Sequence, residues 1–361
     1  LAALLEFAYR RRRPERTAVH RAVRDNWLTF VADAEARHNE IPSFVAKSFE
    51  RYLGCGALAN GFARVRCGDC KTEQLVAFSC KTRGLCTSCD GKRMVEAASH
   101  LVDNVVPEVP VRQWVLTVPP WLRYRLAWDH KLCGVVLRIF VRTVSAWYRR
   151  QARAWDIPDP KCAAVSVTQR FGDGLRLSPH FHVAFVDGVF AKFVEDQGPD
   201  SAPASFERVA RLRQEDVEKV LALTRRKVLR KLLKLGVIVP PEGVPDDDLA
   251  ETSPLLALCG KASMTDRVAV GKDRGQLVAR VMAEPPQPRP HGKLCAALDG
   301  FTCHARTRVA PKDRSGLERL FRYFCRPAFS VRRMRVLPGG DVELLFKQKW
   351  SNGQVSKIFS P

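Results

Sequence analysis

Two histidines in the stretch SPHFHVAFVDGV are the first residues whose spacing suggests chemistry. His180 and His182 flank Phe181 in an otherwise apolar run. Successive side chains of a β-strand point to opposite faces, so we expect the two imidazoles to project side by side while Phe181 faces the core. Imidazoles arranged in this way can hold one divalent cation, and the alternative is a pair of histidines packed in the core. We interpret the pair as a candidate metal site.

A glutamine in the preceding apolar segment supports that interpretation. Gln169, in VSVTQRF, is expected to share one face of a strand with Val165 and Val167. Across a hairpin, its side-chain oxygen could join the two imidazoles as a third ligand and leave the cation open to a substrate phosphate. The alternative is a glutamine on an edge strand that faces water.

Cysteine pairs earlier in the chain predict a second, structural metal site. The chain has 12 cysteines, and CGDC and CTSC each place two of them at C-x2-C spacing, with fifteen residues between the pairs. A two-residue gap lets one tight turn aim both thiolates at one ion, and two such turns complete a tetrahedron, as in zinc ribbons. The predicted Zn2+ ligands are Cys67, Cys70, Cys86 and Cys89. Cys55 and Cys80 remain open as alternative ligands, as neighbours of the ligands or as packed thiols.

A tyrosine among arginines lies in DRSGLERLFRYFCRP. Ser315 and Glu318 have the spacing of a capping box, and Pro327 ends the predicted helix. Tyr323 lies at the margin of an apolar stripe made of Leu317, Leu320, Phe321 and Phe324. The arginines around it are Arg319, Arg322 and Arg326. Guanidinium groups clamp phosphate oxygens, so this phenol suits a phosphate. The alternative is a tyrosine at the edge of an ordinary amphipathic helix.

Apolar periodicity and turn residues indicate the elements that position these side chains. Helices are predicted within residues 1–54, 93–106, 129–155, 208–236 and 315–326. Strands are predicted at 112–118, in a hairpin over 162–190, and near 300–309, 331–336 and 341–347. We therefore expect an α+β protein. Residues 1–106 form a helical and zinc-ribbon-like domain, and residues 107–361 form a mainly antiparallel sheet flanked by helices, with a basic helical insertion at about 191–294.

The charge of the chain indicates its partner. The sequence has 60 Lys and Arg against 38 Asp and Glu, which gives a net charge of +22. Such an excess favours a polyanion, most simply nucleic acid, with a membrane surface as the alternative. No apolar run reaches the roughly 18 residues of a spanning helix. The opening LAALLEFAYRRRR has the reverse order of a secretory signal, so we expect a cytoplasmic protein that joins the nucleoid when it acts.

Taken together, these motifs resemble a known family. They are similar to the motifs of rolling-circle transposases of the IS91 kind, which are called HUH transposases after their His-hydrophobe-His pair. The segments that carry the resemblance are RYLGCGALANGFARVRCGDC, CTSCDGKRM, PVRQWVLTVPP, TQRFGDG, HFHV, DGVF and LFRYFCRP. The resemblance runs from about residue 45 to 355. The cysteine pairs, the histidine pair and the tyrosine helix occur in the order of the family.

The resemblance implies a mechanism. The His pair binds Mg2+ or Mn2+, which polarises a phosphate of single-stranded DNA, at a transposon end or in target DNA. The tyrosine attacks the phosphorus, keeps the 5′ phosphate as a phosphotyrosine and frees a 3′ hydroxyl. Carried over, His180 and His182 are the metal ligands and Tyr323 is the nucleophile, whereas Gln169 as third ligand rests on hairpin pairing alone. The predicted DNA contacts are Arg170, Arg319, Arg322 and Arg326.

The chain also departs from the family pattern. Founding members have two tyrosines four residues apart, and here the second position is Pro327, as in the single-tyrosine relatives. One alternative is a plasmid replication initiator or relaxase that uses the same histidine pair and tyrosine. Another is a non-catalytic zinc-dependent DNA-binding protein. A zinc hydrolase is a third, but the sequence lacks an H-E-x-x-H helix.

Overall fold

The chain folds into two compact units. The computed structural model describes residues 13–191, 204–238, 253, 255, 287–350 and 352–360. The first unit comprises residues 1–109, 169–178 and 311–361, and the second unit comprises residues 110–168 and 179–310. The domain boundary expected near residue 106 lies close to the first change of unit, whereas the segment 311–361 joins the N-terminal part. Each unit has a hydrophobic core of its own.

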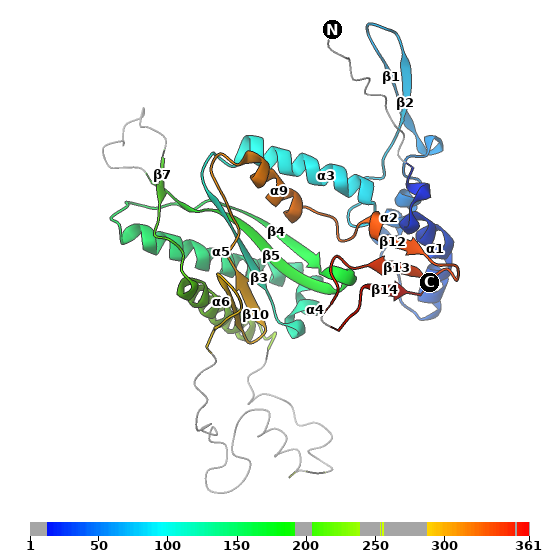
Figure 1. Ribbon diagram of the computed structural model, residues 1–361. Helices are drawn as coiled ribbons and strands as arrows, with labels where there is room; N and C mark the ends of the chain where they lie inside the picture. The colour runs from blue at the N-terminus through cyan, green and yellow to red at the C-terminus, as the bar shows by residue number, and fades with distance from the viewer. Residues whose placement is uncertain are drawn as a thin grey trace. The chain divides into compact units, whose positions relative to one another are not determined.

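The second unit is built on a mainly antiparallel sheet (Figure 1). Its strand order is β4 (Ala164–Phe171), β5 (Leu177–Val186), β3 (Val111–Thr117), β10 (Phe301–His304), β9 (Cys295–Leu298) and β8 (Arg289–Pro290), and β11 (Arg308–Val309) also pairs with β3. β4 and β5 are the arms of the predicted hairpin, and β4 runs from the second unit into the first. In the antiparallel register of β3 and β5, Thr117 lies opposite His180 and Val115 opposite His182.

Helices supply the other half of this core. They are α4 (Pro120–Trp128), α5 (His130–Arg153) and α6 (Gln214–Lys234). α5 begins where the Asp129 carboxylate accepts the Leu132 N–H, and its stripe of Val136, Phe140, Val144 and Trp147 is buried. α4 was not predicted, because Pro119 and Pro120 were assigned only as the end of a strand, whereas Pro120 is also a favourable first residue of a helix.

The predicted basic helix is α6, and Gly236 follows it with φ +65°, a backbone conformation that favours glycine. A second hairpin, β6 (Gly188–Ala191) with β7 (Ser205–Arg208), precedes it. The rest of the expected insertion, residues 192–203 and most of 239–286, lies outside the described residues.

The first unit combines helices with two small sheets. Its helices are α1 (Ala18–Ala36), α2 (Ser43–Leu53), α3 (Thr87–His100) with a π-helical turn at Leu101–Val105, and α9 (Arg314–Phe324). Its sheets are the hairpin of β1 (Phe62–Arg66) and β2 (Glu73–Ala77), and the three-stranded sheet of β12 (Met334–Val336), β13 (Val342–Leu345) and β14 (Ser356–Phe359). Short 3-10 turns lie at Pro14–Arg16, Leu58–Asn60, Asp173–Leu175 and Val331–Arg333.

The architecture confirms the α+β fold class. The core of the first unit is small, and three of its five buried members are cysteines, namely Cys55, Cys86 and Cys89. A core with so few aliphatic side chains gains much of its stability when its thiols bind a metal. Among the described helices, none combines the length and the apolar character that crossing a bilayer requires.

Candidate functional site

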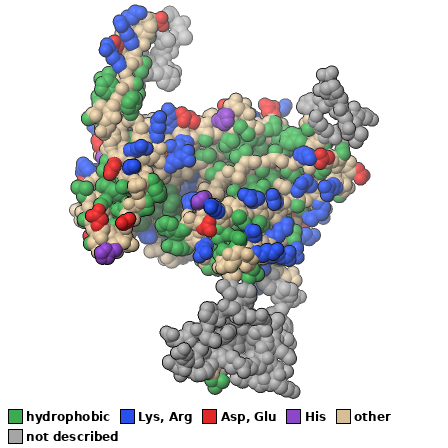
Figure 2. Space-filling view, turned by 180° about the vertical axis from the view of Figure 1, so that it is seen from behind, with side chains coloured by type: hydrophobic (Ala, Val, Ile, Leu, Met, Phe, Trp, Pro, Cys, Tyr) green, Lys and Arg blue, Asp and Glu red, His purple; other side chains and the backbone are tan. Residues whose placement is uncertain are grey.

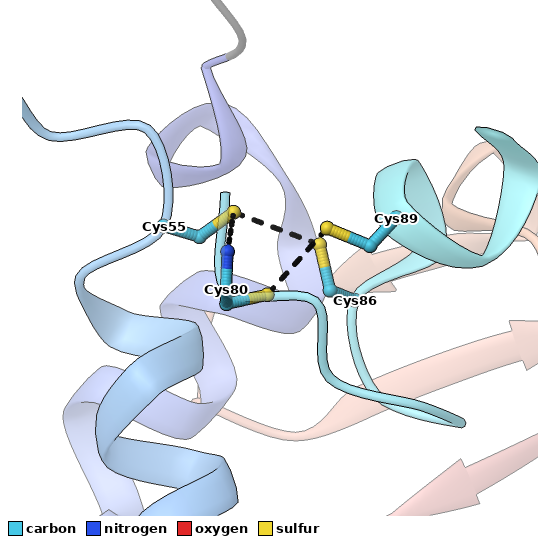
Figure 3. Close-up of side chains that lie close together, drawn as sticks. All are labelled: Cys55, Cys80, Cys86 and Cys89. Atoms are coloured by element: carbon cyan, nitrogen blue, oxygen red, sulfur yellow. Dashed lines mark hydrogen bonds between the residues drawn. The ribbon is translucent and has the colours of Figure 1, made fainter. Parts of the chain in front are cut away.

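Four cysteine thiols of the first unit form one cluster (Figure 3). Cys55 follows α2, Cys80 follows β2, Cys86 is the N-cap of α3, and Cys89 lies in the first turn of α3. All four Sγ atoms lie within 4.8 Å of one another. The Sγ atoms of Cys55 and Cys86 are 3.9 Å apart, and those of Cys80 and Cys89 are 3.6 Å apart. Tetrahedral Zn2+ separates its sulfur ligands by about 3.8 Å, so the four thiols fit a structural zinc ion.

The thiols of the cluster also perturb one another. Hydrogen bonds with the Cys55 and Cys86 thiols lower the pKa of Cys80 far below the usual value of a thiol. The contact with Cys80 raises the pKa of Cys55 to about 11. Zinc is bound by thiolates, so binding of Zn2+ to this cluster would release thiol protons.

The predicted ligands Cys67 and Cys70 lie elsewhere, in the turn of the β1–β2 hairpin. Both are exposed, and the chain turns there through Lys71 at φ +57°. The Cys67 N–H donates to the Thr72 carbonyl at 2.9 Å. The Thr72 hydroxyl, 3.2 Å from the Cys70 Sγ, lowers the pKa of that thiol to about 7.

The grouping seen in the structure therefore replaces the one expected from spacing. C-x2-C spacing fixes how the two thiols of one turn face a common ion, but it does not fix which other thiols they meet. The structure brings Cys86 and Cys89 to Cys55 and Cys80, two single cysteines whose role the sequence left open. No spacing signal marks them, because they are contributed by separate loops.

The two histidines project side by side from β5. Their ring centroids are 4.9 Å apart, with an angle of 69° between the ring planes. Phe181 between them is fully buried in the core of the second unit, on the opposite face of the strand. His182 is buried and His180 half-buried. Strand periodicity predicts this side-by-side placement of the two imidazoles.

A residue that the sequence analysis missed contacts this pair. Gln113 of β3 is buried, and its Nε2 lies 2.9 Å from Nδ1 of His182. An amide can donate to this nitrogen or, turned by 180°, accept its proton through Oε1. In the second orientation Nε2 of His182 is the nitrogen that can bind a cation. The only signal in the sequence is a polar residue directly before the apolar run WVL.

Helix α9 carries the candidate tyrosine. Its N-cap is Asp313, whose carboxylate accepts the Gly316 N–H at 2.8 Å. The prediction that Ser315 caps the helix is wrong, because the side chain of Asp313, two residues earlier, accepts the Gly316 N–H at the start of the helix. The buried stripe is as predicted, with Leu317, Leu320, Phe321 and Phe324. Tyr323 is 41% exposed.

Tyr323 is held from two directions. The guanidinium carbon of Arg326 lies 4.2 Å from the centroid of the Tyr323 ring. The amide of Gln169 donates to the carbonyl oxygens of Tyr323 at 2.7 Å and Phe324 at 2.9 Å. Arg326 Nη2 donates to Gln169 Oε1 at 3.4 Å. In this geometry the Gln169 amide contacts the C-terminal end of α9, and its side-chain oxygen accepts a hydrogen bond from the Arg326 guanidinium.

The other predicted DNA contacts lie on the surface. Arg322 pairs with Glu318 at 2.6 Å, and Arg319 lies 3.9 Å from Asp313. Arg170, next to Gln169, is exposed. Exposed ion pairs of this kind contribute little to stability, so these guanidinium groups can exchange their carboxylates for phosphates at low cost. Tyr323 and its neighbours belong to the first unit, and the histidine pair and Gln113 belong to the second.

A partly buried ion-pair network occupies the other end of β5. Asp187 accepts two hydrogen bonds from Arg112, at 2.8 and 2.9 Å, one from Arg308 at 2.7 Å and one from the Tyr148 hydroxyl at 3.0 Å. Burial alone would raise the pKa of Asp187, but the hydrogen bonds and charge of Arg112, with the hydrogen bond from Arg308, hold it below its usual value. The DGVF motif thus contains a carboxylate that stays ionised.

Comparison with known proteins gives the family of the chain. Residues 23–118 match the family described as "Transposase zinc-binding domain", of the IS91 type, and residues 163–360 match the family described as "Putative transposase". The second match covers more than half of the chain. Neither the curated proteins nor the solved structures include a match. A zinc-binding domain that contains a four-cysteine cluster is thus followed by a transposase domain that contains the histidine pair and the tyrosine helix, and the chain belongs to the IS91 family of transposases.

Proposed function

We propose that this transposase cleaves and rejoins single-stranded DNA at the ends of its element through a 5′-phosphotyrosine intermediate, as rolling-circle transposition requires. The observation that carries the proposal is the placement of Tyr323. Its side chain is 41% exposed, the Arg326 guanidinium lies over its ring, and Gln169 fixes the end of its helix. An accessible phenol beside guanidinium groups is arranged to meet a phosphate.

The histidine pair supports a metal-dependent reaction. His180 and His182 would hold Mg2+ or Mn2+, and Gln113 would orient the His182 ring. The bound cation would polarise the scissile phosphate and neutralise charge that develops on its oxygens. Imidazoles also accept zinc and nickel more readily than magnesium, so Mn2+ is the most informative test ion.

The covalent step balances without a further reactant. The Tyr323 Oη attacks the phosphorus and loses its proton to solvent, while the bond from phosphorus to the 3′ oxygen breaks and that oxygen takes up a proton. The products are a 5′-phosphotyrosine and a free 3′ hydroxyl. Rejoining reverses the step, because an incoming 3′ hydroxyl attacks the phosphotyrosine and releases the phenol. The energy of the phosphodiester bond is kept in the link, so no ATP is needed.

A structural role is proposed for the second metal. Zn2+ at Cys55, Cys80, Cys86 and Cys89 would tie together the loop after α2, the loop after β2 and the start of α3. A structural zinc site of this kind contributes apparent binding energy on the order of 10–16 kcal/mol to folding. This stabilisation would substitute for the small apolar core of the first unit.

Formation of a covalent adduct tests the proposal. The full chain is incubated with Mn2+ and a labelled single-stranded oligonucleotide that carries an end of its element, and the products are separated on a denaturing gel. We expect a protein–DNA band that protease treatment shifts, together with a fragment that has a free 3′ hydroxyl. Binding of the oligonucleotide with no such band would instead favour a non-catalytic DNA-binding protein.

A further inference from the structure

A large pocket of the second unit lies outside the groups described so far for catalysis. Its volume is about 990 Å³, and its wall is formed by the start of β3, the end of β5, the segment 208–214 that leads into α6, and the turns around residues 290–294 and 306–308. Seven of the lining side chains are basic, namely Arg112, Arg208, Arg211, Arg213, Lys293, Arg306 and Arg308. Asp187 is the acidic side chain among the lining residues.

The acidic side chains described at the pocket do not neutralise its positive charge. Asp187 is already shared by Arg112 and Arg308 in the partly buried network. The exposed side chains of Arg208, Arg211, Lys293 and Arg306 have no acidic partner among the residues that the structure describes. Figure 2 shows that Lys and Arg side chains greatly outnumber acidic ones on the face drawn there. Basic groups gathered in a concave site strengthen their joint attraction for an anion.

The pocket is separate from the histidine pair. In the register of β3 and β5, His180 lies opposite Thr117 at one end, whereas Val186, next to Asp187, lies opposite Val111 at the other end. Seven residues of extended chain separate His180 from Asp187, which corresponds to about 23 Å. A ligand of the pocket therefore does not occupy the proposed cation site.

The lining indicates the class of ligand. The apolar lining residues are Val209, Ala210, Leu212, Pro290 and Leu294, and none of the lining residues that the structure describes has an aromatic side chain on which a base could stack. Arginine forks match the oxygens of phosphate groups, so the pocket is suited to a sugar–phosphate backbone and not to the reading of bases.

We propose that this pocket, defined by Arg208, Arg211, Lys293 and Arg306, binds the phosphodiester backbone of a single DNA strand at a distance from the phosphate that is cleaved. The inference rests on the proposed function, because it takes single-stranded DNA as the substrate. The role of the pocket is to retain the strand through contacts that do not depend on base sequence, while the chemistry takes place at Tyr323.

Charge reversal tests the pocket against a matched surface. In the full chain, Arg208→Glu with Arg211→Glu changes two exposed lining side chains, and Arg138→Glu with Arg142→Glu makes the same change of charge on exposed positions of α5. We expect the pocket variant to bind a labelled single-stranded oligonucleotide about tenfold more weakly at low salt. The slope of log affinity against log salt should become shallower by about 0.7 for each phosphate that the variant no longer neutralises. The α5 variant should change affinity much less.

A second measurement locates the strand. Hydrogen exchange of the amides of residues 208–213 is expected to slow when the oligonucleotide binds to the wild-type chain, and not when it binds to the pocket variant. Equal affinities of the pocket and α5 variants, or unchanged exchange in this segment, would overturn the proposal. This test can fail or succeed independently of the adduct assay. If DNA binding depends on the pocket but no covalent adduct forms, the pocket proposal is supported and the tyrosine chemistry is refuted.

Discussion

The side-chain amide of Gln169 donates to the carbonyl oxygens of Tyr323 and Phe324, at 2.7 and 2.9 Å. The last carbonyls of a helix have no partner within the helix, and an amide NH2 group has two protons to give them. A residue of β4 thus closes the end of the helix that carries the proposed nucleophile. We therefore propose that Gln169 positions Tyr323 through its backbone.

Replacement of Gln169 distinguishes this role from metal binding. Gln169→Leu removes both donors and leaves the carbonyl oxygens of Tyr323 and Phe324 without this partner, which should lower the free energy of unfolding by about 1–3 kcal/mol. Gln169→Glu places a carboxylate oxygen against the two carbonyls and should be worse. With single-turnover kinetics, we expect slower adduct formation at an unchanged concentration of Mn2+ for half-maximal rate. A shift of that concentration instead would restore Gln169 as a ligand.

Zinc content tests the cysteine cluster. Cys55→Ser should remove the structural Zn2+ and make the first unit more sensitive to protease, because Cys55 is one of the four clustered thiols. Cys67→Ser is the matched control, since Cys67 lies exposed in the hairpin turn, and this variant should retain the zinc. Metal analysis of the purified variants gives the answer. Loss of zinc from the Cys67 variant, with retention in the Cys55 variant, would return the assignment to the C-x2-C pairs.

The histidine pair should control the metal dependence of cleavage. His180→Ala combined with His182→Ala leaves Tyr323 in place and should abolish the Mn2+-dependent adduct. Gln113→Leu removes the side-chain amide that orients His182 and should lower Mn2+ affinity about 10- to 100-fold, with most of the rate recovered at saturating Mn2+. The measurement is a Mn2+ titration of adduct yield. Full activity of the double variant would show that other residues bind the catalytic cation.

The Asp187 network predicts how stability depends on pH. The pKa of Asp187 is lower in the folded chain than in the unfolded chain, so its contribution is fully present above the unfolded value near 4 and is lost as pH falls through the folded value. Asp187→Asn leaves Arg112 buried without its carboxylate and should destabilise the second unit by about 3 kcal/mol at pH 7. The stability of the Asp187→Asn variant should also decrease less between pH 5 and pH 3 than that of the wild-type chain. Denaturant unfolding at each pH measures both stabilities, and an equal loss in the two proteins would contradict this account.

The sequence predicted the elements whose periodicity is strong. The histidine strand, the long helix α5 and the apolar stripe of α9 follow from which faces must be buried, and these are local properties of the chain. The grouping of Cys55 and Cys80 with Cys86 and Cys89 depends on how loops from different elements meet. Spacing along the chain carries no information about that meeting.

The role of Gln169 shows the same limit. Strand alternation predicted that Gln169 shares a face with Val165 and Val167, but the partner of its amide is a backbone carbonyl 154 residues further along the chain. Gln113 was missed because a single buried amide resembles any polar residue in a strand. For Asp187, the DGVF motif marks the position, but its charge partners come from β3 and β11.

The most direct measurement compares the wild-type chain with Tyr323→Phe in the Mn2+-dependent adduct assay. The substitution removes only a hydroxyl from a side chain that is 41% exposed, so folding, zinc content and affinity for single-stranded DNA should be unchanged. Peptide mapping of the wild-type adduct should place the 5′ phosphate on Tyr323, and the variant should form no adduct. A covalent band of normal intensity from the Tyr323→Phe protein would contradict the account, because another residue would then be the nucleophile.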